Sequence, residues 1–188
     1  PIMSNVASGA AARPFVTHHN ALDLDLHLRI ALELPLKRLV VGGIERVYEI
    51  GRVFRNEGLS TEHNPEFTMI EFYQAYATYE TLMDLTEELI VSLADNVLGT
   101  RLVRYGELEI DFAPPWRRLS MKDAVQELGD LPAGLDLNTL EGLHQAAVHF
   151  GDEDLLDSSD YGKVLYELFD RHIEEKIVNP TFITRHPL

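Results

Sequence analysis

An acidic side chain interrupts an otherwise apolar face in the run from Glu66 to Tyr73. The run is rich in β-formers, and side chains alternate across a strand, so Phe67, Met69, Glu71 and Tyr73 share one face. The core face of a strand normally carries no carboxylate, because a buried charge is costly unless a cation or hydrogen-bond donors meet it. The sequence therefore predicts that a positively charged group binds beside Glu71.

A second group of polar side chains lies just before this run. Arg55 ends the preceding β-rich segment, Glu57 follows it, and His63 and Asn64 stand in the loop that leads to Phe67. Arginine binds phosphate or carboxylate with two parallel hydrogen bonds, glutamate accepts the protons of an amino group, histidine can meet a terminal phosphate, and phenylalanine can stack on a base. These residues fit a small ligand that bears both charges. A polar hairpin with a surface Arg–Glu ladder is the structural alternative, and the spacing alone leaves both open.

Two strands joined by a loop must position these residues. Residues 47–55 and 66–73 are β-rich on either side of a loop that contains Gly and Asn, which predicts a long hairpin. Further strands are predicted at 13–17, 102–105, 108–112 and 181–184, and helices at 34–41, 78–99, from Ser120, from Asn138 and over 164–177. The apolar stripe of the helix at 78–99 is predicted to be core. Antiparallel hairpins with helices between and after them predict an α+β fold rather than a doubly wound parallel sheet.

The composition limits the class of protein. The chain has 188 residues, of which 45% are apolar, enough for one folded domain. Its 16 Lys and Arg against 31 Asp and Glu give a net charge of −15, which argues against non-specific adhesion to nucleic acid, so any polyanion must bind locally. The absence of Cys suits a reducing cytoplasm, and no membrane-spanning run is predicted. Because the chain starts at Pro1 and stops at Leu188 just past a strand-like run, we expect a fragment.

The hairpin sequence carries a resemblance to a known family. The run VYEIGRVFRNEGLSTEHNPEFTMIEFYQAY resembles motif 2 of the class II aminoacyl-tRNA synthetases, a strand that ends in F-R-x-E, a variable loop and a second strand that opens with Phe. The runs ARPFVTHHNALDLDLHLRIALELPLKRLVVGG and NPTFITRHP are similar to the lysyl-tRNA synthetases in particular, and Pro1 resembles the end of motif 1. The resemblance implies that residues 1–188 form a partial class II catalytic domain, an antiparallel sheet flanked by helices. The N-terminal OB-fold anticodon domain and motif 3 of the family are absent from this chain.

The resemblance also implies an activity. A lysyl-tRNA synthetase activates lysine with ATP to lysyl-adenylate and transfers the lysine to tRNA(Lys). The full-length enzyme is expected to be a cytoplasmic homodimer that uses Mg²⁺, with the Mg²⁺ ligands in a part of the protein beyond this chain, and the fragment is expected to be inactive alone. Two alternatives stay open at this point. One is a synthetase-like paralogue that lysylates a protein, and the other is a non-catalytic regulatory paralogue that binds an amino acid.

On the ATP side, the resemblance implies a role for each matched residue. Arg55 is the implied catalytic residue, which clamps the α-phosphate of ATP and the carboxylate of lysine. Glu57 would lie by the adenine amino group and Phe67 would stack on adenine. His63 and Asn64 would complete the ATP-binding residues.

The resemblance implies a second set of residues that bind lysine. Gly9 and Glu33 would meet the α-amino group, Arg55 the carboxylate, and Glu71 with Tyr73 the ε-ammonium. The carboxylate predicted on the core face of the strand then has a cationic ligand. No residue of the chain is implied as a metal ligand. The adjacent His18 and His19 are no exception, because neighbouring side chains on a strand face opposite ways and make a poor metal pair.

Overall fold

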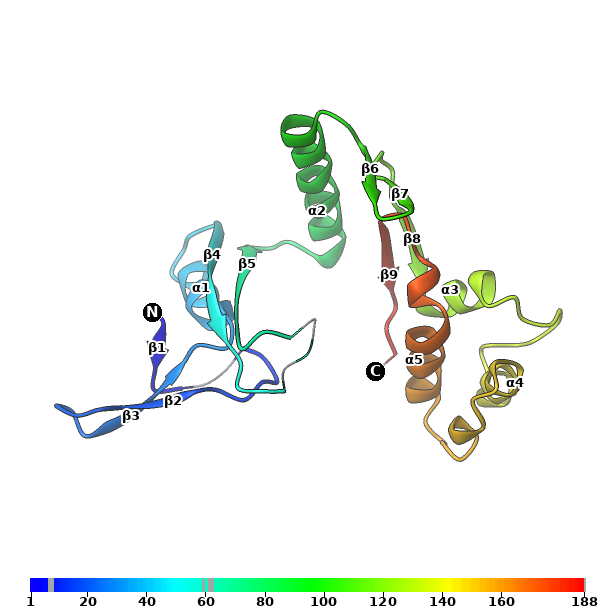
Figure 1. The fold of residues 1–188 in the computed structure, drawn as a ribbon, viewed down its shortest axis with the longest axis horizontal. Helices are drawn as coiled ribbons and strands as arrows, with labels where there is room; N and C mark the ends of the chain where they lie inside the picture. Colours follow the sequence, from blue (N-terminus) through cyan, green and yellow to red (C-terminus); the bar gives the residue numbers. More distant parts are fainter. Residues whose placement is uncertain (7–8, 59, 61–62, 188) are drawn as a thin grey trace. The chain divides into compact units, whose positions relative to one another are not determined.

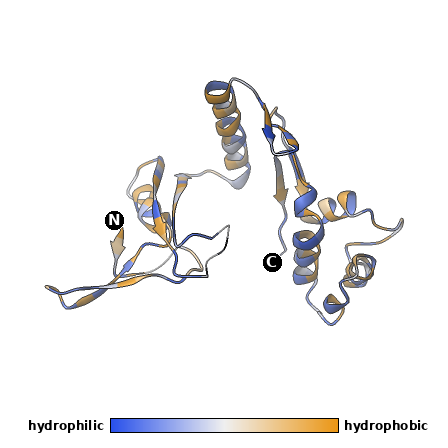
Figure 2. Cartoon of the chain, viewed as in Figure 1, coloured by the Kyte–Doolittle hydropathy of each residue, from blue (hydrophilic) through white to orange (hydrophobic). Residues whose placement is uncertain are grey.

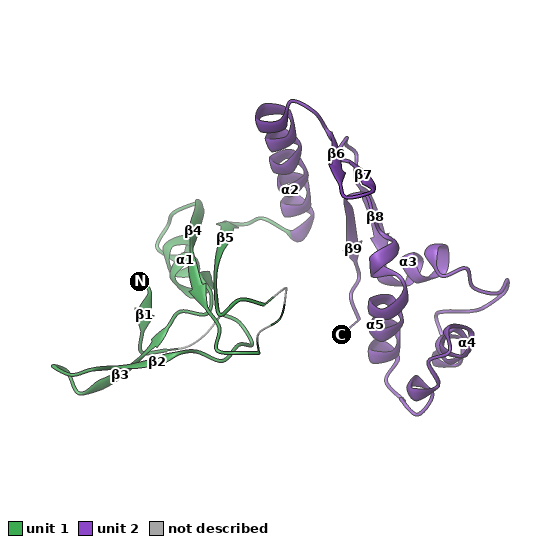
Figure 3. Cartoon of the chain, viewed as in Figure 1, with its two compact units in different colours: residues 1–78 green, residues 79–188 purple. Residues whose placement is uncertain are grey.

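A long antiparallel hairpin dominates the first of the two units into which the chain divides, residues 1–78 and 79–188 (Figure 1 and Figure 3). The structure is a computed structural model that describes residues 1–6, 9–58, 60 and 63–187. Strand β4 (Arg46–Phe54) pairs with β5 (Glu66–Gln74) in one continuous register. This pairing confirms the predicted hairpin.

A three-stranded antiparallel sheet and one helix complete unit 1. The strand order is β1 (Met3–Ser4), β3 (Leu24–Leu28) and β2 (Val16–His19). Helix α1 (Glu33–Val41) follows β3 and carries Pro35 in its first turn, where the missing amide hydrogen costs nothing. It ends at Gly42, as the sequence predicted, and Gly43 then adopts a φ of 100°, which favours glycine.

The small sheet departs from the prediction in two places. The strand expected at 13–17 begins only at Val16, because Pro14 has no amide hydrogen for a ladder. Sequence analysis missed β3 altogether. The signal for it is present, since Leu24, Leu26 and Leu28 alternate with polar residues, which is typical of a half-buried strand.

Helix α1 covers the odd-numbered face of the hairpin. Leu32, Leu36 and Val53 are buried at this contact. The partly buried side chains packed around them are Val47, Phe67, Met69 and Tyr73. The prediction that residues 67, 69, 71 and 73 share the core face of β5 is therefore confirmed, and this face carries the candidate site described below.

Unit 2 is built from helices around an apolar core and from short strand pairs (Figure 1). Its helices are α2 (Tyr79–Leu93), α3 (Met121–Leu128), α4 (Leu140–Phe150) and α5 (Tyr161–His172), with a π-helical turn at Ala94–Leu98 and 3-10 turns at Glu153–Leu155 and Glu174–Lys176. Its strands are β6 (Leu102–Tyr105), β7 (Leu108–Asp111), β8 (Arg117–Ser120) and β9 (Thr181–Thr184). The core joins α3, α4 and α5, and its fully buried side chains include Met121, Leu143 and Leu168.

Side-chain caps decide where the helices of unit 2 begin. The Ser120 hydroxyl accepts a hydrogen bond from the Asp123 amide at 3.0 Å, which confirms the predicted start of α3. The prediction for α4 is wrong by one residue. Thr139, not Asn138, is the cap, because its hydroxyl accepts from the Gly142 amide at 3.0 Å.

The strands confirm the α+β class and add one parallel pair. In the described residues, β6 and β7 form the second predicted hairpin, and the final strand at 181–184 is present as β9. Strand β9 pairs with β8 in a parallel register, from Arg117 opposite Thr181 to Ser120 opposite Thr184. Sequence analysis had assigned no strand at 117–120, so it could not foresee this pairing of distant segments.

The apolar stripe of α2 is not core in this structure, which corrects the prediction. No residue of α2 is buried, and Leu85 and Leu89 are each 38% exposed. Hydrophobic colour runs along α2 in Figure 2. Polar side chains of the helix contact the rest of unit 2: Glu87 accepts from the Trp116 amide, and Asp84 pairs with Arg118. Periodicity identified the apolar face correctly, but burial needs a second apolar face packed on it.

A close backbone contact makes Gly142 of α4 sensitive to substitution. A methyl group there would lie 2.6 Å from the carbonyl carbon of Asp136 and 3.2 Å from the Thr139 hydroxyl. We expect Gly142→Ala to lower the free energy of unfolding by about 1–3 kcal/mol, because the backbone must move to admit the extra carbon. Urea unfolding followed by circular dichroism measures this. The matched control is Gln145→Ala, an exposed position of the same helix, and equal midpoints for the two variants would contradict the prediction.

Candidate active site

Five of the residues predicted from sequence line one hollow at the open end of the hairpin. The hollow has a volume of about 260 Å³. Its lining residues are Arg55, Glu57, Gly58, His63, Asn64 and Phe67. Arg55 directly follows β4, Phe67 lies at the start of β5, and the loop between the strands supplies the others. The structure thus brings together every residue that the resemblance implied for the ATP side.

The Arg55 guanidinium lies over an aromatic face. Its Cζ is 5.2 Å from the ring centroid of Phe67, within the range of a cation–π contact. Its Nε donates to the Ile30 carbonyl at 3.4 Å. Among the described residues, no carboxylate forms an ion pair with Arg55, so the fork that binds phosphate or carboxylate is not neutralised. The site therefore offers a positive charge and an aromatic ring side by side.

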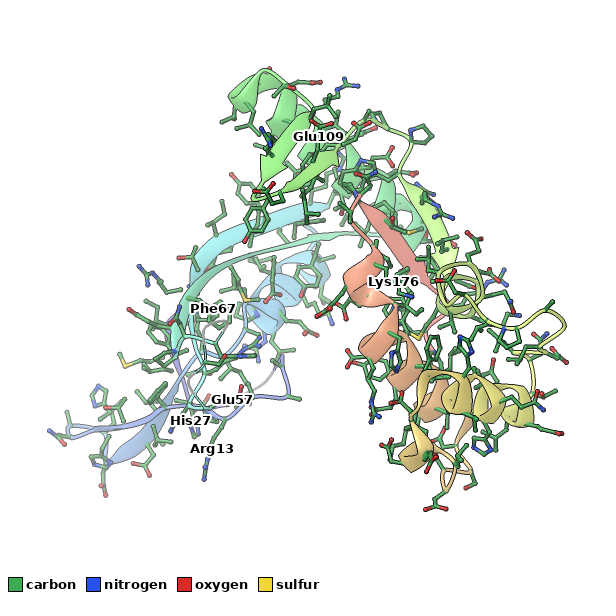
Figure 4. The ribbon with its side chains drawn as sticks, turned by 45° about the vertical axis from the view of Figure 1, so that its right-hand side comes forward. Arg13, His27, Glu57, Phe67, Glu109 and Lys176 are labelled. Carbon is green, nitrogen blue, oxygen red and sulfur yellow. The ribbon has the colours of Figure 1, made fainter. Side chains whose placement is uncertain are left out.

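The chain segment at Arg13 fixes the position of Glu57. The Glu57 carboxylate accepts from the Arg13 amide at 3.3 Å, and the Arg13 carbonyl accepts from the Asn56 amide at 2.7 Å. Arg13, Glu57 and Phe67 are labelled in Figure 4, all within unit 1. In the loop, His63 is oriented by Ser60, since its Nδ1 lies 2.8 Å from the Ser60 hydroxyl. These contacts hold two polar groups at the rim of the hollow.

Hydrogen-bond donors meet the Glu71 carboxylate on the core face of β5. Its Oε1 accepts from the Leu32 amide at 2.9 Å, just before α1, and its Oε2 accepts from the Tyr73 hydroxyl at 2.7 Å. Burial, the hydrogen bond to Glu71 and the negative charges of Glu71 and Glu33 raise the pKa of Tyr73. The sequence predicts that a positively charged group binds beside Glu71. Among the described residues the carboxylate meets two uncharged donors and no ion-pair partner, so the positively charged group stays a prediction.

Glu33 and Gly9 lie next to each other at the start of α1. A methyl group on Gly9 would be 3.1 Å from the Glu33 Cβ and 3.7 Å from its Oε2, and Gly9 has a φ of 93°, so glycine is favoured there on both counts. The other carboxylate oxygen of Glu33 forms an ion pair with Lys37. The Lys37 ammonium also lies 5.8 Å from the ring centroid of Tyr73. The residues predicted for the α-amino group and for the ε-ammonium are thus joined through Lys37.

A buried backbone segment connects the two sides of the site. Ile30 and Leu32 are 2% and 0% exposed, and their backbone groups contact Arg55 and Glu71 respectively. The side chains of Phe67 and Glu71 lie on the same face of β5. Sequence reasoning missed this segment and Lys37, although the apolar run that precedes α1 indicates a buried stretch. Phe67 of the ATP-side hollow and the Glu71 carboxylate therefore lie on the same face of β5, and residues 30–32 contact both sides.

Comparison with known proteins assigns the family. Residues 1–188 match the family described as tRNA synthetases class II (D, K and N), and the chain belongs to this family. It is 52% identical over 188 residues to the lysine–tRNA ligase of Bacillus cytotoxicus and 51% identical over 188 residues to that of Bacillus subtilis. It is also 52% identical over 190 residues to the lysine–tRNA ligase of Staphylococcus saprophyticus.

These relatives are longer than the chain. All of this chain is covered in each comparison, but only 37% of the two Bacillus proteins and 38% of the Staphylococcus protein. The relatives confirm the resemblance to lysyl-tRNA synthetases and match that hypothesis rather than either alternative. They also confirm the class II α+β fold expected from the motifs.

The described residues also bear on metal binding and on membranes. Across residues 1–6, 9–58, 60 and 63–187, no three His, Asp or Glu side chains converge as a metal site. His18 contacts Asp25 instead, with 2.8 Å between Nδ1 and Oδ1. In the same part of the chain, every helix is too short or too polar to cross a bilayer.

The raised pKa of Tyr73 can be tested by an ultraviolet titration of the tyrosines. A group whose pKa is raised on folding stabilises the fold below its unfolded pKa, about 10 for tyrosine, and this contribution is lost as the pH rises through the higher folded pKa. We therefore expect Tyr73 to stay protonated while exposed tyrosines ionise. In an ultraviolet difference titration between about pH 9 and 11, wild type and Tyr73→Phe should show the same amplitude. An amplitude smaller by one tyrosine in the variant would contradict this.

Proposed function

We propose that the protein containing this chain activates lysine with ATP and transfers it to tRNA(Lys). The observation that carries the proposal is that Phe67, which lies beside an Arg55 without an ion-pair partner among the described residues, shares one face of β5 with the Glu71 carboxylate. A ligand on this face meets a positive charge and an aromatic ring at one end and a negative charge at the other. ATP and lysine together have that distribution of charges. The relatives, named as lysine–tRNA ligases, support the same activity.

In the proposed reaction, an oxygen of the lysine carboxylate forms a bond to the α-phosphorus of ATP, and pyrophosphate leaves with the electrons of the broken P–O bond. The attacking carboxylate is already ionised, so no general base is needed. Arg55 contacts both the α-phosphate and the carboxylate, holds them in position and neutralises their charge. Phe67 stacks on adenine, Glu57 accepts from the adenine amino group, and His63 and Asn64 line the ATP side.

Recognition of lysine rests on two carboxylates. Glu71, oriented by the Leu32 amide and the Tyr73 hydroxyl, binds the ε-ammonium. Glu33, next to Gly9, binds the α-amino group. A site built around polar groups rejects ligands that lack the matching partners, because its own groups would be left unpaired.

The remaining parts of the proposal concern the whole protein. The family resemblance supports Mg²⁺ as a cofactor, tRNA(Lys) as the acceptor, a homodimer as the oligomeric state and the cytoplasm as the location. Because the chain spans 37% of its Bacillus relatives, the activity is proposed for the full-length gene product and the chain alone is expected to be inactive.

The test is ATP–pyrophosphate exchange by the full-length gene product with each proteinogenic amino acid in turn. We expect exchange with lysine alone, and charging of tRNA(Lys) when tRNA is added. Sedimentation is expected to show a dimer. If none of the amino acids supports exchange, the proposal is contradicted. Activation of lysine without charging of tRNA would point to a protein acceptor instead.

A further inference from the structure

Lys37 contacts both ends of the proposed lysine site. Its ammonium forms an ion pair with Oε1 of Glu33, one helical turn earlier, and lies 5.8 Å from the ring centroid of Tyr73. Tyr73 in turn donates to Glu71. An ordinary (i, i+4) pair on a helix surface stabilises the helix by a few tenths of a kcal/mol and has no third contact. The contact with the ring of Tyr73 sets Lys37 apart from such a pair.

The two carboxylate oxygens of Glu33 have different neighbours. Oε1 is held by Lys37, whereas Oε2 is the oxygen near Gly9. The Glu33 side chain is 30% exposed, so without a partner it can turn toward solvent. A cation on one oxygen therefore fixes the rotamer in which the other oxygen faces the backbone at Gly9.

We propose that Lys37 is a positioning residue, which holds Glu33 so that its second oxygen receives the α-amino group of lysine. This inference rests on the proposed function, since it assigns Glu33 to the α-amino group. Lys37 does not touch the reacting atoms. It acts through Glu33, and it keeps one positive charge beside the Glu33 carboxylate and the ring of Tyr73.

The sign of the effect distinguishes positioning from charge alone. Lysine carries a net positive charge, so removing a nearby cation would strengthen its binding if Lys37 acted only through its electrostatic field. Loss of positioning has the opposite result, because Glu33 becomes free to turn away from the ligand. A Lys37→Met variant keeps the length of the side chain and removes the charge.

The experiment measures lysine affinity of the full-length gene product by calorimetry and ATP affinity in parallel. We expect Lys37→Met to raise the lysine Kd about fivefold, the scale of an exposed ion pair, and to leave the ATP Kd unchanged. Lys37→Arg should restore lysine binding, because arginine also pairs with a carboxylate. Arg38→Met is the matched control, since it removes one cation from the next position of the same helix and should leave both constants unchanged.

A lysine analogue locates the effect. ε-Aminocaproate has the carboxylate and the ε-ammonium of lysine but no α-amino group, so its Kd should be the same for wild type and Lys37→Met. In the double variant with Glu33→Gln, Lys37→Met should add no further loss.

Three results would overturn the inference: tighter or unchanged lysine binding in Lys37→Met, an equal loss for lysine and ε-aminocaproate, or additive losses in the double variant. Wild-type protein that fails to bind lysine at all would instead refute the proposed function, so the two failures are distinct.

Discussion

Replacing Arg55 by alanine in the full-length gene product is expected to lower lysine-dependent ATP–pyrophosphate exchange by on the order of 100-fold or more, the usual scale for the loss of one preorganised electrostatic donor. The guanidinium is held by the Ile30 carbonyl and the ring of Phe67, and no described carboxylate pairs with it. Its charge is therefore free to stabilise the α-phosphate as the new bond forms. Exchange kinetics at saturating ATP and lysine measure the loss.

Arg55→Lys is expected to restore little of this activity. A lysine ammonium is a point charge, which reproduces neither the two parallel hydrogen bonds of the guanidinium nor its planar contact with Phe67. The matched control is Arg52→Ala on the same strand, because Arg52 is exposed and pairs with Glu66. Near-normal exchange in Arg55→Ala, or an equal loss in Arg52→Ala, would remove Arg55 from the site.

Local patterns were sufficient to predict the hairpin and the face that carries the site. Alternation along a strand is set by backbone geometry, so the shared face of Phe67, Glu71 and Tyr73 followed from their spacing alone. The hollow that gathers Arg55 and His63 follows from the same hairpin, since its open end holds the end of β4 and the start of β5.

Features that depend on contacts between distant segments were not predicted. The donors on Glu71 come partly from the Leu32 amide, which lies on another element and carries no side-chain signal. The parallel pairing of β8 with β9 joins segments far apart in the sequence. The stripe of α2 has the period of a buried face, yet the helix has no buried residue. In each case the outcome depends on which other surface is present.

Glu71→Gln is expected to raise the lysine KM of the full-length gene product by about 10- to 100-fold, the range for a hydrogen bond to a charged group. The amide keeps the shape of the side chain. Its carbonyl oxygen can still accept from the Leu32 amide, and its NH₂ group can donate to the Tyr73 hydroxyl in place of the bond now donated by Tyr73. The fold therefore loses no hydrogen bond, and the change is confined to the negative charge that binds the ε-ammonium.

The comparison with ATP makes this prediction specific. The hydrogen bonds of Glu71 come from Leu32 and Tyr73, whereas Arg55 contacts Phe67. The ATP KM should therefore stay near the wild-type value. Glu66→Gln is the matched control, because it removes the same charge from an exposed position of β5. An unchanged lysine KM, or an equal rise for ATP and lysine, would mean that Glu71 only ties β5 to the start of α1. Recognition of the ε-ammonium would then have to come from residues outside this chain.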